Sequence, residues 1–142
     1  MSVELDGNNL SLEEIWKISC EQEQIKLSPE AENRVVRCRQ YVEDIISQNK
    51  TVYGLTTGFG KFSNIKIPID QIEELQENLI LSHATGVGPW LSIPETRSIM
   101  LLRINVLAKG YSGIRLETLQ LLIDLLNKSV HPCIPEKGSV GA

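Results

Sequence analysis

The stretch Thr51-Val-Tyr-Gly-Leu-Thr-Thr-Gly-Phe-Gly-Lys-Phe62 lies between two segments that have helical periodicity. Its three glycines, Gly54, Gly58 and Gly60, fall within seven residues, and Tyr53 directly precedes the first of them. Glycine permits backbone angles and close approaches that other residues resist, so this stretch predicts a shaped loop rather than a regular element. Loops held on a rigid scaffold are common places for catalytic and binding groups.

The spacing of these glycines disfavours nucleotide binding. A Walker-type loop has four residues between its first glycine and its Gly-Lys-Ser/Thr, whereas five residues separate Gly54 from Gly60. Phe62 also stands after Lys61, where the metal-binding hydroxyl would be. The dinucleotide fingerprint would require a third glycine at Ser63. A tight structural turn remains an alternative interpretation of the stretch.

Composition and charge exclude several classes of protein. The 142 residues are 42% hydrophobic and 23% charged, which is ordinary for one domain with its own core. The net charge is −4 without a basic block, so we expect no nucleic-acid surface. No apolar run reaches the roughly 20 residues that span a bilayer, and the N-terminus lacks signal-peptide features. The three cysteines are widely spaced without a CxxC, so we expect no metal site and a cytoplasmic location.

Helix start signals and apolar periodicity predict a mainly α fold. Residues 11–14 and 92–95 are capping boxes, and Ser28-Pro29 combines an N-cap with a first-turn proline. Strand signals are weak, with at most short extended pieces at residues 51–53 and 65–67. The expected helices cover about residues 11–20, 28–47, 70–85, 92–109 and 116–128.

The last two expected helices are too apolar for a free surface. In residues 99–108 only Arg103 and Asn105 interrupt the apolar side chains, and such a helix is typically buried in a larger assembly. We expect a structural role for Asn105 and leave Arg103 open between structure and a site. The sequence also stops at Gly141-Ala142 inside a loop-like segment. We therefore expect residues 1–142 to be the N-terminal part of one larger helical-bundle domain, with no second domain.

Three stretches together resemble the histidine ammonia-lyase family, within the aromatic amino acid lyases. They are Val52-Tyr-Gly-Leu-Thr-Thr-Gly-Phe-Gly-Lys61, Asn78-Leu-Ile-Leu-Ser-His-Ala-Thr-Gly-Val-Gly88 and Gly138-Ser-Val-Gly-Ala142, in the expected order. Residues 103–113 are also similar to the family. The resemblance implies a carbon-nitrogen lyase that releases ammonia from L-histidine to give trans-urocanate in histidine degradation, and that assembles as a homotetramer.

The resemblance also implies a prosthetic group made from the protein itself. Family members cyclise an Ala-Ser-Gly triplet into a methylidene-imidazolone (MIO), an electron sink for the departing amine. Ala142 matches the first residue of that triplet, and the Ser and Gly that should follow are absent from this sequence. Gly138, Ser139 and Gly141 would shape the bend before it. The 142 residues alone are therefore not expected to be active.

The resemblance further implies roles for individual residues. Tyr53 matches the tyrosine proposed as the base that removes the β-proton, which requires its pKa to fall roughly three units from about 10. Ser82-His83 matches the pair that accompanies histidine as substrate, and His83 could hydrogen-bond the substrate imidazole. Gly60 would help shape the loop above the substrate. The alternatives are a tyrosine packed under a glycine loop and a histidine that caps a helix.

Other functions stay open on the sequence. A phenylalanine or tyrosine ammonia-lyase, or an aminomutase, of the same superfamily would share the fold, but the pair Ser82-His83 argues against these enzymes. A non-catalytic helical binding module would have no reason to stop at Gly141-Ala142. A structural helical subunit would not require Tyr53 before a glycine loop.

Overall fold

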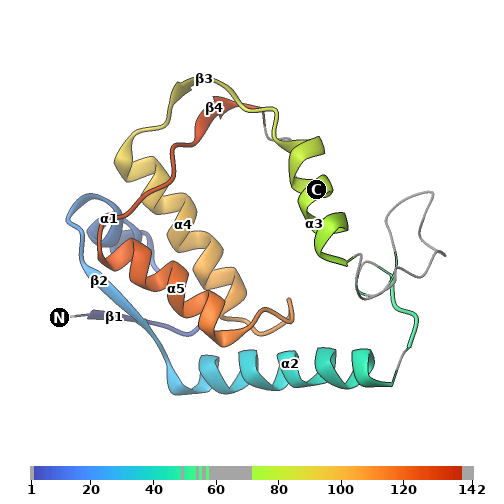
Figure 1. Ribbon diagram of the computed structural model, residues 1–142. Helices are drawn as coiled ribbons and strands as arrows, with labels where there is room; N and C mark the ends of the chain where they lie inside the picture. Colours follow the sequence, from blue (N-terminus) through green and yellow to red (C-terminus); the bar gives the residue numbers. More distant parts are fainter. Residues whose placement is uncertain (1, 49, 54, 56, 58–71, 139–142) are drawn as a thin grey trace. The chain divides into compact units, whose positions relative to one another are not determined.

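The computed structural model describes residues 2–48, 50–53, 55, 57 and 72–138 (Figure 1). The chain divides into two units, Met1–Val42 with Pro89–Ile134 (unit 1) and Glu43–Gly88 with Pro135–Ala142 (unit 2). The described residues form five helices joined to short strands, which confirms the mainly α prediction. The elements are β1 Ser2–Leu5, α1 Leu12–Cys20, β2 Gln24–Leu27, α2 Pro29–Ser47, α3 Ile72–His83, β3 Val87–Trp90, α4 Ile93–Leu107, α5 Leu116–Asn127 and β4 Pro135–Lys137.

The helix starts lie where the sequence predicts them. The capping boxes of residues 11–14 and 92–95 both form, at the beginnings of α1 and α4. Ser28 Oγ accepts the backbone N–H of Ala31 at 3.1 Å and so caps α2. Each cap satisfies N–H groups that the first helical turn leaves without an intrahelical partner.

The core of unit 1 lies where α4 packs against α1 and α5 (Figure 1). Strands β1 and β2 pair in parallel, from Ser2 opposite Gln24 to Leu5 opposite Leu27. Strand β2 also contacts α5, which covers the apolar side chains of the pair. The side chains with no more than 1% of their surface exposed include Leu5, Ile18, Val35, Leu101, Ile104, Leu119, Ile123 and Leu126.

A buried arginine joins three segments of unit 1. Arg97 on α4 is 1% exposed, and its Nε and Nη2 donate to the Ile18 carbonyl at 3.0 and 2.8 Å. Its Nη1 donates to the Leu126 carbonyl at 2.9 Å and to His131 Nε2 at 3.0 Å. Both carbonyls lie in the last turn of a helix, α1 or α5, where the helix dipole is negative. The periodicity of the apolar residues gave no sign of this interaction.

One of the two predicted extended pieces needs correction. Residues 51–53 form no strand, because the N–H of Leu55 donates to the Val52 carbonyl at 3.1 Å and closes a turn there. Residues 65–67 lie outside the described residues. The four strands of the described residues have four residues or fewer, which is too short for a reliable alternating pattern.

Helix α3 ends at His83, two residues before the predicted Thr85.

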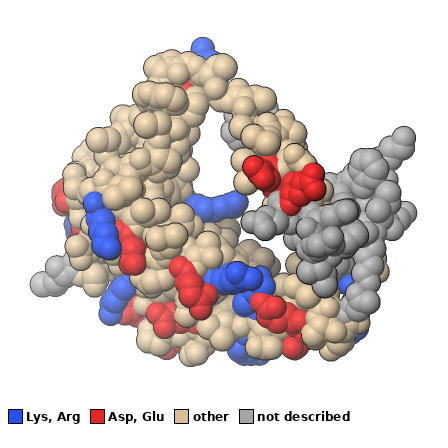
Figure 2. Space-filling view, in the orientation of Figure 1, with Lys and Arg blue, Asp and Glu red and all other residues tan. Residues whose placement is uncertain are grey.

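Positive and negative side chains lie interspersed over α2 on the face seen in Figure 2. Two ion pairs of unit 1 join Lys17 to Glu13 at 2.6 Å and Lys26 to Glu4 at 2.9 Å. Among the helices of the described ranges, none has the length and apolarity to cross a membrane. The described part of the chain also holds no group of three His, Cys, Asp or Glu side chains placed for a metal ion.

Candidate functional site

The last turn of α3 brings Ser82 and His83 together around one carbonyl group. Ser82 Oγ donates to the Leu79 carbonyl at 2.9 Å, and His83 Nδ1 lies 2.8 Å from the same oxygen. Ser82 Oγ and His83 Nδ1 are 2.9 Å apart. Both residues are exposed in the described part of the chain. The prediction that this pair occupies the end of a helix is confirmed.

A close backbone contact follows directly after this helix end. Gly138 has a φ of +137°, and a Cβ there would lie 2.6 Å from Gly86 Cα and 3.0 Å from the Thr85 carbonyl oxygen. A Cβ on Gly86 would lie 2.7 Å from Pro135 Cγ. Real Cβ atoms do not approach other atoms so closely, so only glycine fits either position without movement. The segment after His83 therefore packs against the segment that leads into residues 139–142.

The pairing of β3 with β4 supports this contact. The two strands form a two-stranded sheet (Figure 1), and the N–H of Leu91 donates to the Ile134 carbonyl at 2.9 Å next to it. Gly86 immediately precedes β3, and Gly138 immediately follows β4. The strand pair therefore fixes the register in which the two glycines meet.

Tyr53 lies in the turn closed by the Val52–Leu55 hydrogen bond, and its side chain is 63% exposed. The three glycines of its predicted loop, Gly54, Gly58 and Gly60, lie outside the described residues. A donor-rich surrounding for Tyr53 therefore stays a prediction. Ser139, Gly141 and Ala142 also lie outside the described residues, so their roles stay predictions as well.

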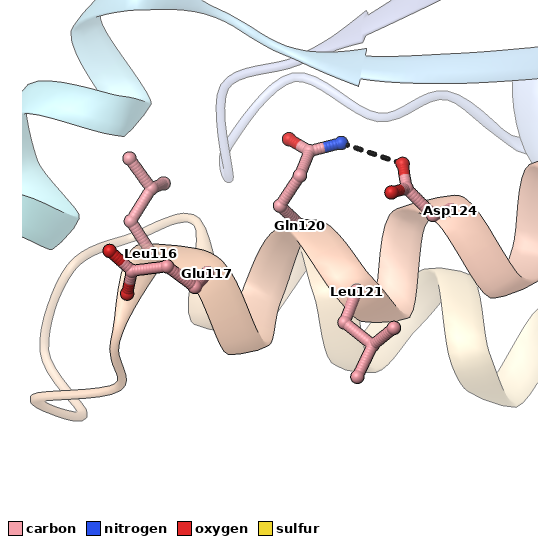
Figure 3. Close-up of a pocket in the computed structure, with 5 residues that line it drawn as sticks. All are labelled: Leu116, Glu117, Gln120, Leu121 and Asp124. Carbon is pink, nitrogen blue, oxygen red and sulfur yellow. Dashed lines mark hydrogen bonds between the residues drawn. The ribbon is translucent and has the colours of Figure 1, made fainter.

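An open pocket of about 440 Å³ lies along α5 (Figure 3). In the close-up, Gln120 and Asp124 point to the same side of the helix, and Gln120 Nε2 donates to Asp124 Oδ1 at 2.9 Å. The lining also includes Leu116, Glu117 and Leu121. Because none of its lining residues is a predicted site residue, this pocket adds nothing to the candidate site.

Comparison with known proteins decides the family. The sequence profile of the aromatic amino acid lyases matches residues 10–142. The chain belongs to the aromatic amino acid lyase family. The expectation drawn from the three motif-bearing stretches is confirmed.

Known relatives of this aromatic amino acid lyase chain include histidine ammonia-lyases. The chain is 52% identical to the histidine ammonia-lyase of Natranaerobius thermophilus over 140 residues, which cover 99% of the chain and 28% of that protein. The crystal structure of Trypanosoma cruzi histidine ammonia-lyase superposes with a TM-score of 0.91 at 43% identity, over 99% of this chain and 27% of that one. The ergothionase of Treponema denticola gives the same TM-score at 36% identity, over 99% and 28%. The chain thus spans just over a quarter of these relatives' length.

One backbone contact in the described part of the chain is compatible with the prosthetic group that the family uses. Cyclisation brings an amide nitrogen unusually close to a carbonyl carbon, which requires a tightly bent backbone. The contact of Gly138 with Gly86, which any Cβ would disrupt, supplies such a constraint at the start of the predicted loop. Sequence reasoning identified Gly138 but missed Gly86 as its partner, although Gly86 stands in the same quoted motif as His83.

Proposed function

We propose that this chain is part of a histidine ammonia-lyase, which eliminates ammonia from L-histidine to give trans-urocanate. The observation that carries the proposal is the pair Ser82-His83 at the end of α3, directly before the contact of Gly86 with Gly138. This contact joins the segment predicted to recognise an imidazole to the segment predicted to build the electrophile. The 52% identity to a histidine ammonia-lyase supports the same substrate.

The elimination divides into tasks for which this chain provides residues. When formed, the MIO group supplies an electrophile that captures the amine, and Ala142 contributes its first residue, with Gly138, Ser139 and Gly141 shaping the bend. Tyr53 removes the β-proton of the substrate, which requires a surrounding that stabilises the phenolate. His83 holds the imidazole ring, and Gly60 shapes the loop above it.

The proposal includes assembly as a cytoplasmic homotetramer of a larger single-domain polypeptide. Ile99, Leu102 and Val106 lie along one face of α4 and are 45%, 46% and 53% exposed. Beside them, the buried Oδ1 of Asn105 has no hydrogen-bond partner among the described residues, whereas Arg103 is exposed. Assembly would cover this apolar face. All three cysteines are free thiols, which agrees with a reducing compartment.

The role of His83 is tested by changing the substrate preference. In a full-length protein that carries this sequence, His83→Leu should lower kcat/KM for L-histidine at least about 100-fold, because the imidazole loses its hydrogen-bond partner. The same variant should gain relative preference for L-phenylalanine. Glu77→Gln, an exposed change on the same helix, is the matched control. An unchanged ratio of histidine to phenylalanine turnover in His83→Leu would reject the role, and a wild-type preference for phenylalanine or tyrosine would favour the related lyases and aminomutases.

The roles of Tyr53 and of the prosthetic group have separate readouts. Tyr53→Phe should lower kcat by several orders of magnitude, while the intact mass should remain short of the genetic mass by two molecules of water. Those two molecules are lost when the triplet that begins at Ala142 cyclises and dehydrates. Full turnover in Tyr53→Phe would exclude the base role. A wild-type mass without the deficit would exclude the prosthetic group.

A further inference from the structure

Three atoms at the end of α3 form a closed triangle. The Leu79 carbonyl oxygen lies 2.9 Å from Ser82 Oγ and 2.8 Å from His83 Nδ1, and Oγ and Nδ1 are 2.9 Å apart. All three separations are hydrogen-bonding distances, so each contact requires a hydrogen on one of its two atoms. The triangle therefore determines where the protons lie.

The positions of the hydrogens follow from the Leu79 carbonyl, because its oxygen can only accept a hydrogen bond. Ser82 has one O–H, which donates to the Leu79 oxygen. If Nδ1 carried a lone pair, it would face the Leu79 lone pairs at 2.8 Å, a repulsive contact. Nδ1 therefore carries the hydrogen and shares it between the Leu79 oxygen and Ser82 Oγ. In the neutral ring, Nε2 is then left without a hydrogen and is an acceptor.

We infer that Ser82 is a positioning residue that, together with the Leu79 carbonyl, holds His83 as the Nδ1–H tautomer with Nε2 presented as an acceptor. Its partner is the ring N–H of a substrate imidazole, so the inference rests on the proposed function. The second acceptor, Ser82 Oγ, restrains rotation of the ring by binding Nδ1 from a second direction. An orienting hydrogen bond on one ring nitrogen generally fixes the role of the other.

This arrangement has a consequence for substrate choice. Phenylalanine has no N–H to offer, so its binding would leave the Nε2 lone pair without a partner, and such sites discriminate strongly against the analogue that lacks the group. Methylation of either ring nitrogen removes the N–H of the neutral imidazole, because the other nitrogen then carries only a lone pair. Both ring-methylated L-histidines should therefore be turned over far more slowly than L-histidine at alkaline pH.

The alternative is a purely structural role, in which Ser82 only stabilises the end of α3. Serine often donates to a carbonyl three or four residues earlier, and this bond alone explains the contact with Leu79. Ser47 provides the comparison, because its Oγ donates to the Asp44 carbonyl at 2.9 Å in the last turn of α2. The residue after Ser47 is Gln48, so that helix end has no imidazole to orient. Ser47→Ala therefore measures the structural effect by itself.

The experiment combines a tautomer measurement with kinetics in a full-length protein that carries this sequence. Long-range ¹⁵N–¹H spectra of histidine-labelled protein, with His83 assigned from its loss in His83→Leu, should show hydrogen on Nδ1 and a bare Nε2. Ser82→Ala should shift His83 toward a mixture of tautomers and lower kcat/KM for L-histidine about tenfold, whereas Ser82→Thr should restore both. Ser47→Ala should change neither quantity.

The possible results distinguish a failure of this inference from a failure of the proposed function. Hydrogen on His83 Nε2 in the wild-type protein, or a Ser82→Ala variant with the wild-type tautomer and wild-type kcat/KM, would overturn the inference while L-histidine turnover persists. Turnover of either ring-methylated L-histidine at the rate of L-histidine at alkaline pH would also overturn it. A wild-type protein without activity on L-histidine would instead remove the proposed function on which the inference rests.

Discussion

Among the side chains that bind carbonyls in the last turns of the described helices, one group in each unit shows contrasting surroundings. In unit 1, Arg97 donates to the carbonyls of Ile18 and Leu126 and is 1% exposed. In unit 2, Ser82 and His83 bind the Leu79 carbonyl and are exposed. The first group uses all its polar atoms within the protein. The second leaves one ring nitrogen for another molecule.

This difference distinguishes a side chain that stabilises the fold from side chains that are available for recognition. A buried guanidinium is tolerated only when its N–H groups are satisfied, so the Arg97 interaction is a requirement for stability. An exposed imidazole can exchange its partners with water at little cost, so the α3 end contributes little to stability and can be used for recognition.

Removing the buried interaction should have the largest effect. Arg97→Met removes the guanidinium donors of the Ile18 and Leu126 carbonyls from the core, although Leu126 keeps the backbone N–H of Ser129, and should lower the free energy of unfolding by about 3 kcal/mol. Arg103→Met, which changes an exposed arginine on the same helix, should stay within about 0.5 kcal/mol. Urea unfolding measures both variants. Equal effects of the two substitutions would mean that Arg97 is not a structural centre.

Disrupting the contact of Gly138 with Gly86 should have the second-largest effect on stability. Gly138→Ala forces its Cβ against Gly86 at 2.6 Å and should destabilise unit 2 by about 1–3 kcal/mol and reduce activity. Gly88→Ala is the control, because Gly88 also has a positive φ, +96°, but its Cβ would meet nothing closer than 3.9 Å. Differential scanning calorimetry can compare the two variants. If Gly88→Ala destabilises as much as Gly138→Ala, the backbone angle and not the contact is responsible.

Loss of a helix cap should have a smaller effect on the free energy of unfolding. Ser92→Ala removes the hydroxyl that accepts the Glu95 N–H at the start of α4, and should lower the free energy of unfolding by about 1 kcal/mol. Ser92→Asp retains an acceptor and should preserve most of the stability. Thermal unfolding followed by circular dichroism measures both. A loss as large as that of Arg97→Met would contradict the ranking of burial over capping.

The smallest expected effect is a pH dependence in unit 1. Burial, and then the positive charge of Arg97, lower the pKa of His131 below its usual 6.5. Neutral His131 accepts from Arg97, so its stabilisation is complete above pH 6.5 and is lost as the pH falls through the lowered folded-state pKa. Unfolding free energies measured across this range should fall less steeply in His131→Gln. An identical slope in both proteins would exclude His131 as the source.

The scaffold was largely predictable from the sequence, because its signals are local. The capping boxes at 11–14 and 92–95 give two helix starts directly, and the apolar periodicity of the helices indicates their buried faces. The parallel pairing of β1 with β2 was not predictable, because strands of four residues joined across a helix leave no distinctive pattern.

The candidate site was only partly predictable. The resemblance identified Ser82, His83 and Gly138, but the contact of Gly138 with Gly86 depends on strand pairing between distant segments. Arg97 was missed for the same reason, since its partners Ile18, Leu126 and His131 come from three separate parts of the sequence. The apolar periodicity of a helix indicates which face is buried, but it does not indicate which backbone carbonyls lie against that face.

The most direct test of the proposed function is the release of ammonia by a full-length protein that carries this sequence. L-histidine, L-phenylalanine and L-tyrosine would be supplied separately, and the kcat/KM for each measured. We predict turnover of L-histidine to trans-urocanate, with the two aromatic amino acids slower by at least about 100-fold. Faster release of ammonia from phenylalanine or tyrosine, or no release from L-histidine, would contradict it.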